Sequence, residues 1–369
     1  MTEQNRLRRG SFLPNYAVHP GEFISEWLEQ RGMTQVELAD RIALSTKQLN
    51  QIIRGHKPIT QETALKLEAV TSIAARFWNS AQALYEEDVA RIAGDAELTD
   101  HVSFLGQVPV AALRKAGHVS KSSSHDKLAT LKEVLAFFGV AHPDAWERLW
   151  MAPAAAFRRS AAFAERPGAT ATWLRVGELA ASGVDAPPFD ANRLKAILPG
   201  LRSLSTMPAF DNMLANAKDL CAMAGVLLVV VPDIFGARCS GATRWIGGRP
   251  VVQLSMRFRK DDQFWFTLFH ELGHVLLHPR NEVFIDEGVE DEARKHMEAE
   301  ADHFATETLI PSDVSVGLRE LRSQDAIVRF AEHLEIAPGI VVGRLQHDGI
   351  VPHTHFNRLK RTYALPSAA

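Results

Sequence analysis

Cysteine is scarce in this sequence, with only Cys221 and Cys239 among 369 residues. The two lie far apart and form no CxxC pair, which excludes a disulfide framework and a cysteine-rich metal site. Such sparing use of cysteine is typical of proteins from a reducing compartment, so we expect a cytoplasmic location.

Long apolar runs are missing as well. The most apolar stretch, "AMAGVLLVVV" at residues 222–231, is too short to span a bilayer. The basic start "MTEQNRLRRG" is followed by a proline and polar residues instead of an apolar segment, so a signal peptide is not expected. We therefore expect no membrane partner.

A large charge of either sign is also absent. The formal net charge is -3 and 46% of the residues are hydrophobic, which describes an ordinary folded protein without a general attraction to polyanions. Any surface for nucleic acid therefore has to be local. A chain of 369 residues exceeds the usual size of one hydrophobic core, and changes in composition divide it at about residues 92, 205 and 311.

The pattern of apolar residues predicts a mainly α, α+β protein. Residues 1–92 are expected to form an all-α head, and residues 93–205 a helical connecting or dimerisation region interrupted by loops. In residues 206–311, "GVLLVVV" predicts a strand, "CSGATRWIGGRPVVQLS" a hairpin turning at Gly247 and Gly248, and a long helix begins at about Asp261. Residues 312–369 are expected to be a helical C-terminal extension of that domain.

The segment "TQVELADRIALSTKQLNQIIRG" has the layout of a helix-turn-helix. Thr34 and Glu37 fit a capping box, and Ser45 fits the start of the second helix. That helix is the candidate for reading DNA, through polar side chains able to bond bases and phosphates: Ser45, Thr46, Lys47, Gln48, Asn50 and Gln51. The alternative is the ordinary solvated face of a helical bundle. Because residues 1–60 carry eight Lys and Arg against six Asp and Glu, we expect weak binding by one copy and a homodimer on a double-stranded operator.

A longer stretch around these helices, about 70 residues from "HPGE" to "ARFWNSAQALYE", resembles the HigA-type antitoxins of the Xre helix-turn-helix family. The resemblance rests on those two ends and on "TQVELA" and "LSTKQLNQIIRG" between them. It implies transcription regulation by operator binding as a dimer, and extends to the neutralisation of a ribonuclease toxin in a toxin–antitoxin pair.

The stretch "FTLFHELGHVLLH", residues 266–278, is apolar except for a few ionisable side chains. His270 and His274 are four positions apart and share one face of a helix, a spacing that lets two imidazoles bind one Zn²⁺. Glu271 occupies the place where a metalloprotease keeps its general base. We expect this helix to be buried, with a metal compensating its ionisable groups, and Gly273 predicts a close approach of backbone or substrate.

A third ligand is expected from "EAEADHFATETLIP", residues 298–311. Glu298 would complete a His₂Glu site that leaves one position for water, as in catalytic zinc sites. Helix geometry favours it over its rival Glu300, and Asp302 is placed to accept the free N–H of a ligating histidine. His278 is interpreted as a helix-capping residue before Pro279, with a contact to a metal ligand as the alternative.

Together, "HELGHVLLH" and "EAEADHFATETLIP" resemble the ImmA/IrrE family of zinc metallopeptidases, and the E-x-x-x-D step is similar to the third-ligand helix of the thermolysin-type gluzincins. The resemblance spans roughly residues 210–311 and continues through "FAEHLEIAPGIVVGRLQHDGIV", residues 330–351. It implies a small gluzincin-like domain that hydrolyses peptide bonds with a metal, where Glu271 takes a proton from the attacking water and returns it to the leaving amine. The strand edge at residues 242–246 is expected to pair with an extended substrate.

Two functions stay open. In the first, a DNA-binding transcriptional regulator is joined to a zinc-dependent endopeptidase that cleaves a regulatory protein, such as a repressor or a toxin partner. In the second, a HigA-like antitoxin or repressor carries a C-terminal zinc domain that binds a partner or signal without cleaving it. The intact set of His270, Glu271, His274 and Glu298 favours the first, because a domain that only binds has no chemical need for Glu271.

Overall fold

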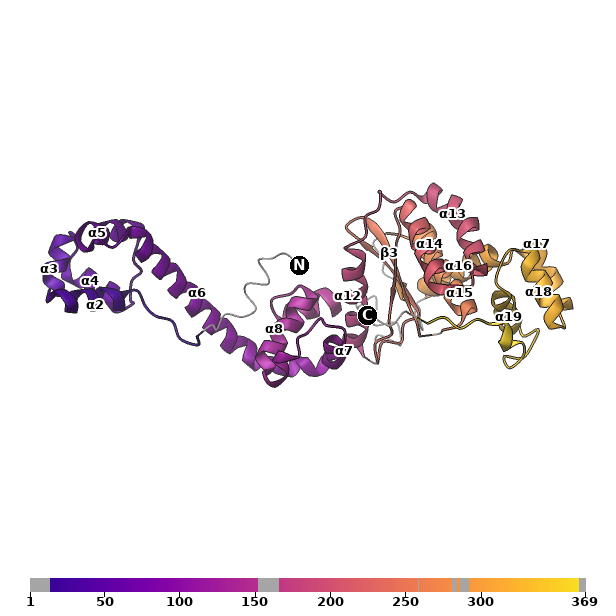
Figure 1. Cartoon of the computed structure of the whole chain (residues 1–369), viewed down its shortest axis with the longest axis horizontal. Coiled ribbons are helices and arrows are strands. Elements are labelled where there is room, and N and C mark those ends of the chain that lie inside the picture. Colours follow the sequence, from indigo (N-terminus) through magenta and orange to yellow (C-terminus); the bar gives the residue numbers. More distant parts are fainter. Residues whose placement is uncertain (1–13, 152–165, 258, 281–283, 286–291, 365–369) are drawn as a thin grey trace. The chain divides into compact units, whose positions relative to one another are not determined.

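The computed structural model describes residues 14–151, 166–257, 259–280, 284–285 and 292–364. The chain divides into two compact units, Met1–Val102 and Ser103–Ala369. Helices dominate both units, and the second unit adds one four-stranded sheet, which confirms the predicted mainly α, α+β class (Figure 1). Among the described residues, no helix has the length and apolar character needed to cross a membrane.

The described part of the first unit is all-α, as the sequence predicts. Its helices are α2 (Gly21–Arg31), α3 (Gln35–Arg41), α4 (Thr46–Ile53), α5 (Gln61–Thr71) and α6 (Ala75–Asp100). They enclose one core built around the fully buried side chains of Leu38, Leu49, Leu67 and Trp78. The helix α6 continues past the expected boundary at residue 92, because the segment "ARIAGDAELTD" is rich in good helix formers and one glycine does not end a helix.

Two capping boxes fix the starts of α3 and α4. The Thr34 hydroxyl accepts from the Glu37 backbone N–H, and the Glu37 carboxylate accepts from the Thr34 N–H. Ser45 and Gln48 form the same reciprocal pair at the start of α4. Each box satisfies backbone groups that a helix start leaves unpaired, so both helix starts are set by local sequence.

From Val102 onward the chain forms a further series of helices. They are a 3₁₀ turn (Val102–Gln107), α7 (Val110–Lys115), a 3₁₀ turn (Ser122–His125), α8 (Lys127–Phe138), α9 (Pro143–Trp146), a π-helical turn (Glu147–Met151) and α12 (Pro167–Ala181). The Trp146 ring of α9 packs edge to face with Phe104 of the first 3₁₀ turn and with Phe138 of α8. The described residues of the region expected to be helical with intervening loops are therefore mainly helical.

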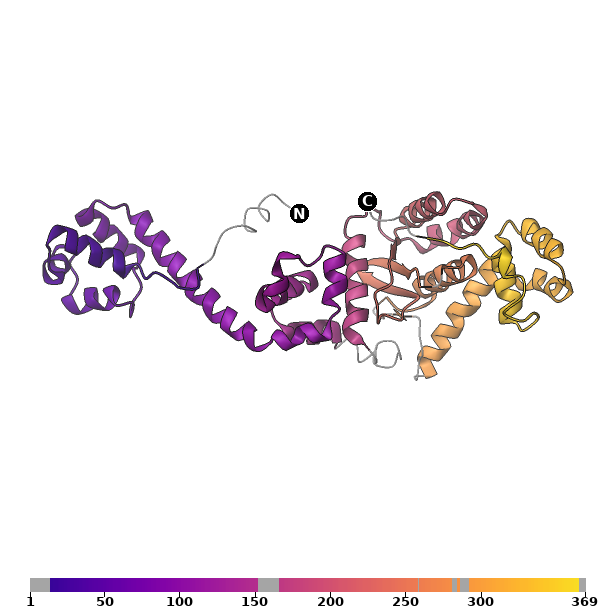
Figure 2. The ribbon, with the colours of Figure 1, turned by 60° about the horizontal axis from the view of Figure 1, so that its bottom comes forward.

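The strands of the sheet are the arrows in Figure 2. Their order is β1-β3-β2-β4. The strands are β1 (Leu227–Val231), β2 (Gly241–Ile246), β3 (Arg249–Ser255) and β4 (Phe284–Ile285). β1 runs parallel to β3, whereas β2 is antiparallel to both β3 and β4. The predicted hairpin is confirmed: Gly247 and Gly248 have φ values of 57° and 78°, the positive pair that a tight two-residue turn requires.

The two faces of the sheet are covered by different helices (Figure 1). Leu227 and Val229 of β1 share a buried cluster with Trp173 of α12. Leu228 lies between these two residues on β1, so its side chain points to the opposite face of the sheet. There it belongs to a larger cluster together with Val252 of β3. That cluster includes α13 (Ala191–Ser203), α14 (Phe210–Met223), α15 (Asp261–Leu277) and α16 (Glu292–Leu309).

The C-terminal part adds α17 (Ser312–Ser315), a 3₁₀ turn (Val316–Glu320), α18 (Gln324–His333), α19 (Pro338–His347) and a final 3₁₀ turn (Asn357–Leu359). Val341 and Leu345 of α19 are fully buried in the same cluster as Phe269 of α15. In this cluster α19 packs against α15 of the expected domain at residues 206–311, and α12, from the expected connecting region, covers the other face of the sheet. A two-faced sheet needs a helix on each side, and a helix buried all round needs neighbours on each side.

Candidate metal centre

The helix α15 carries the ionisable side chains that the sequence singles out. Leu268, Phe269 and Leu272 on it are fully buried, and the helix contacts the sheet, α16 and α19. Asp261 and Asp262 lie in its first turn, where acidic groups stabilise the helix dipole. The helix is therefore held from several sides, so its side chains have fixed positions.

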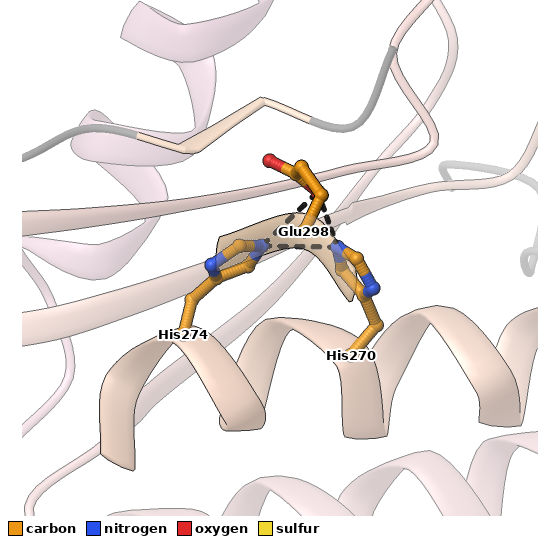
Figure 3. A group of neighbouring side chains, drawn as sticks. All are labelled: His270, His274 and Glu298. Atoms are coloured by element: carbon orange, nitrogen blue, oxygen red, sulfur yellow. Dashed lines mark hydrogen bonds and ion pairs between the residues drawn. The ribbon is translucent and has the colours of Figure 1, made fainter. Parts of the chain in front are cut away.

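His270, His274 and Glu298 bring one donor atom each to a common point (Figure 3). The Nε2 atoms of the two histidines are 3.0 Å apart. The Glu298 Oε2 atom, carried by α16, lies 3.1 Å from the Nε2 of His270 and 3.4 Å from the Nε2 of His274. The structure thus brings together the three residues expected to bind a metal.

This donor set fits a zinc ion. Donors about 2 Å from a tetrahedral Zn²⁺ stand about 3.3 Å from one another, close to the three separations here. Burial lowers the pKa of His274 to about 4, so its ring is neutral. Burial alone would raise the pKa of Glu298, but hydrogen bonds from His270 and His274 outweigh it and bring the pKa down to about 2. Neutral imidazoles and an ionised carboxylate are the forms that bind metal.

Side chains behind the two histidines fix their orientation. Asp302 Oδ1 lies 2.8 Å from the Nδ1 of His270, where the sequence expects an acceptor. The Nδ1 of His274 lies 2.8 Å from the Nδ1 of His278, whose own Nε2 is 3.2 Å from Glu300 Oε2. Glu300 therefore contacts His278 and stays outside the three-donor cluster.

Glu271 is buried next to the start of β2. The Thr243 hydroxyl donates to Glu271 Oε2 at 2.6 Å, and Glu271 has no exposed surface. Gly241 lies so close that a Cβ atom on it would collide with Glu271 Oε1. Sequence reasoning missed Thr243, because nothing in the local pattern links it to a residue 28 positions away.

The edge of β2 differs from the expectation. Ala242 and Thr243 pair with Ile285 and Phe284 of β4, so this stretch of the edge is already occupied. An extended substrate therefore has no free backbone to pair with at these two residues. A strand of two residues is too short to give a sequence signal, which is why β4 was not expected.

The predicted close approach of backbone at Gly273 is confirmed, because α16 lies close to α15 at this residue. A Cβ atom at this position would lie 3.2 Å from the Cα of Ala301 and 3.1 Å from the Phe304 ring. The missing side chain therefore lets α16 lie close against α15, which brings Glu298 within reach of the histidines.

The residues expected to contact DNA lie on α4 and at its start. Ser45, Thr46, Lys47 and Gln48 are exposed, whereas Asn50 and Gln51 are half-buried. The Asn50 amide donates to the side chain of Gln35 at 3.0 Å. Ser45 and the Gln48 carbonyl are engaged in the capping box, so Thr46, Lys47 and Gln51 are the side chains best placed to reach a ligand.

Comparison with known proteins gives matches in both units. The peptidase M78 family model, described as the IrrE N-terminal-like domain, matches residues 233–346, and a helix-turn-helix family model matches residues 24–77. Virulence-associated protein I of Dichelobacter nodosus is 33% identical over 75 residues, which are 20% of this chain and 69% of that protein. The structure of an addiction module antidote protein of a HigA family from Coxiella burnetii is 28% identical, covers 23% of this chain and 92% of its own, and has a TM-score of 0.22.

Proposed function

Since the chain belongs to the helix-turn-helix family through residues 24–77 and to the IrrE N-terminal-like peptidase family through residues 233–346, we propose that it is a DNA-binding regulator joined to a zinc-dependent endopeptidase. The observation that carries the peptidase part is the convergence of His270, His274 and Glu298 beside a buried Glu271. The substrate we propose is a regulatory protein, either a repressor or a toxin partner.

Each side chain has a role in this proposal. His270, His274 and Glu298 would hold Zn²⁺, which supplies a Lewis acid for the scissile carbonyl and for water. Glu271 takes a proton from the attacking water and delivers it to the leaving amine. Thr243 holds the Glu271 carboxylate by its hydrogen bond, and Asp302 keeps the Nε2 of His270 turned towards the metal position.

The first unit supplies the DNA-binding part. We propose that α4 enters the major groove of an operator with Thr46, Lys47 and Gln51 towards the DNA, while Ser45 and Gln48 hold the helix start and Asn50 braces it against Gln35. A homodimer on two half-sites is the form we expect, because one copy carries few positive charges near this helix.

Metal analysis of the purified chain tests the centre. We expect about one zinc per chain in the wild type, loss of zinc in His270→Ala and in Glu298→Ala, and retention in Glu300→Ala, whose carboxylate lies outside the cluster. Glu271→Gln should keep the zinc and lose hydrolysis of the substrate protein. Zinc retained by Glu298→Ala would refute the ligand set, and full activity of Glu271→Gln would refute the mechanism.

A further inference from the structure

A cavity of about 540 Å³ lies in the second unit between α15, α16 and α19. Ser240, the residue before β2, adds to its wall. This volume is typical of sites that enclose a small ligand or several side chains.

Three contacts place this cavity next to the reacting groups. Phe266 lines it, and the centroid of its ring is 6.2 Å from that of His270. Asp302 lines it and also holds His270. Thr267 lines it one turn before Glu271, and a Cβ atom on Gly241 would lie only 2.7 Å from the Thr267 methyl group. The cavity therefore lies next to the residues that contact His270, and its wall at Thr267 is one helix turn from Glu271.

One part of the cavity wall is aliphatic, and the rest carries polar side chains such as Gln263 and Gln346. Leu309, Ile310 and Ile340 border it and are at most 4% exposed. The charged groups that line it already have partners: Lys360 contacts the Asp262 carboxylate, and Arg344 lies 2.7 Å from Asp348. A charged ligand would have to compete with these pairs, whereas an apolar side chain gains burial against the three aliphatic residues.

We propose that this cavity binds a bulky apolar side chain of the substrate peptide, beside the bond to be cleaved. The proposal rests on the proposed endopeptidase function and names the side chain that its substrate presents. It also gives the substrate a binding surface that does not depend on the β2 edge at Ala242 and Thr243, which β4 occupies.

Peptide selection with the full chain tests the proposal. Zinc-loaded Glu271→Gln protein, which should bind without cleaving, is incubated with a mixed library of short peptides blocked at both ends, and the bound peptides are sequenced. We expect enrichment of Leu, Ile, Met or Phe at one fixed position. Enrichment of charged residues at that position, or no selection at all, would overturn the proposal.

A pair of tryptophan variants ties the selection to the cavity. Thr306 lines the cavity from a half-buried position on α16, so Thr306→Trp in the same background should fill it and weaken the selected peptides at least about tenfold. His303 is exposed on the same helix and does not line the cavity, so His303→Trp should leave their affinity unchanged. Equal affinity in both variants would assign the cavity to another ligand.

A third variant covers the case in which Thr306→Trp does not fold. Phe266→Ala enlarges the cavity and should shift the selected residue towards a larger side chain, and an unchanged selection would contradict the proposal. Wild-type hydrolysis of the selected peptides is a separate readout. Apolar selection without hydrolysis would refute the proposed peptidase and leave the cavity assignment standing, whereas hydrolysis without apolar selection would do the reverse.

Discussion

The Nδ1 atoms of His274 and His278 lie 2.8 Å apart, and the Nε2 of His278 lies 3.2 Å from Glu300. For His274 to offer its Nε2 to a metal, its Nδ1 has to carry the proton. His278 then accepts at Nδ1 and donates from Nε2 to the Glu300 carboxylate. This chain of hydrogen bonds would fix both the tautomer and the ring orientation of His274.

Removing His278 should therefore weaken metal binding without removing a ligand. We expect His278→Phe to lower zinc affinity about 10-fold to 100-fold, measured by competition with a chelator. Glu300→Gln keeps an acceptor oxygen for His278, so its zinc affinity should fall less than that of His278→Phe. His296→Ala, which changes an exposed neighbour of Glu300, is the control and should bind zinc like the wild type. An unchanged affinity in His278→Phe would remove His278 from the centre.

A methyl group at residue 241 should separate metal binding from catalysis. In Gly241→Ala the new Cβ collides with Glu271 Oε1, so the carboxylate has to move. We expect zinc content to stay normal while kcat/KM falls on the order of a hundredfold, the usual effect of a displaced general base. Gly200→Ala is the matched control, since a Cβ there meets no atom within 4 Å. Equal losses in both variants would point to a general effect on folding.

Lys47 offers a test of the helix-turn-helix. If its exposed ammonium contacts a phosphate, Lys47→Ala should weaken binding to all operator sequences alike and reduce the slope of log K against log salt by about 0.9. Lys66→Ala is the control, because that lysine lies on α5 and pairs with Glu62. Salt titrations of operator binding give both values, and an unaltered slope in Lys47→Ala would place the DNA elsewhere.

Asp261 should make stability depend on pH. It has no exposed surface, and burial raises its pKa to about 6, with the nearby Asp262 adding to the rise. Because an unfolded aspartate titrates near pH 4, the folded chain binds this proton more tightly, and the stabilisation is lost as pH rises from about 4 through 6. The difference corresponds to roughly 3 kcal/mol.

Asp261→Asn removes that titration. Its free energy of unfolding should therefore rise relative to the wild type as the pH goes from about 4 to 7, which denaturant unfolding at several pH values measures. Asp325→Asn, at an exposed position, should follow the wild type throughout. Parallel curves for Asp261→Asn and the wild type would mean that folding leaves the pKa of Asp261 unchanged.

The features that sequence predicts correctly are those encoded locally. The start of α3 follows from Thr34 and Glu37, three positions apart, and the hairpin turn follows from two adjacent glycines. The helix α15 follows from its apolar pattern together with His270 and His274. In each case the residues that decide the structure are neighbours in the chain.

What the sequence does not reveal depends on distant segments. Thr243 contacts Glu271 only because β2 lies against α15. β4 pairs with β2 although α15 separates the two strands in the sequence. His278 shows how two interpretations of one residue are both correct. Its backbone ends α15, as expected, while its ring also contacts His274, a distinction that depends on side-chain orientation.

At position 273, helix propensity and the close packing of α16 favour different residues. An alanine there would make α15 a better isolated helix by about 1 kcal/mol, yet its methyl group would press on the backbone of α16 at Ala301. The glycine thus lowers the intrinsic stability of one helix so that the Glu298 carboxylate on another can approach His270 and His274. The helix propensity of α15 taken alone favours alanine at this residue, whereas the packing of α16 against α15 favours glycine.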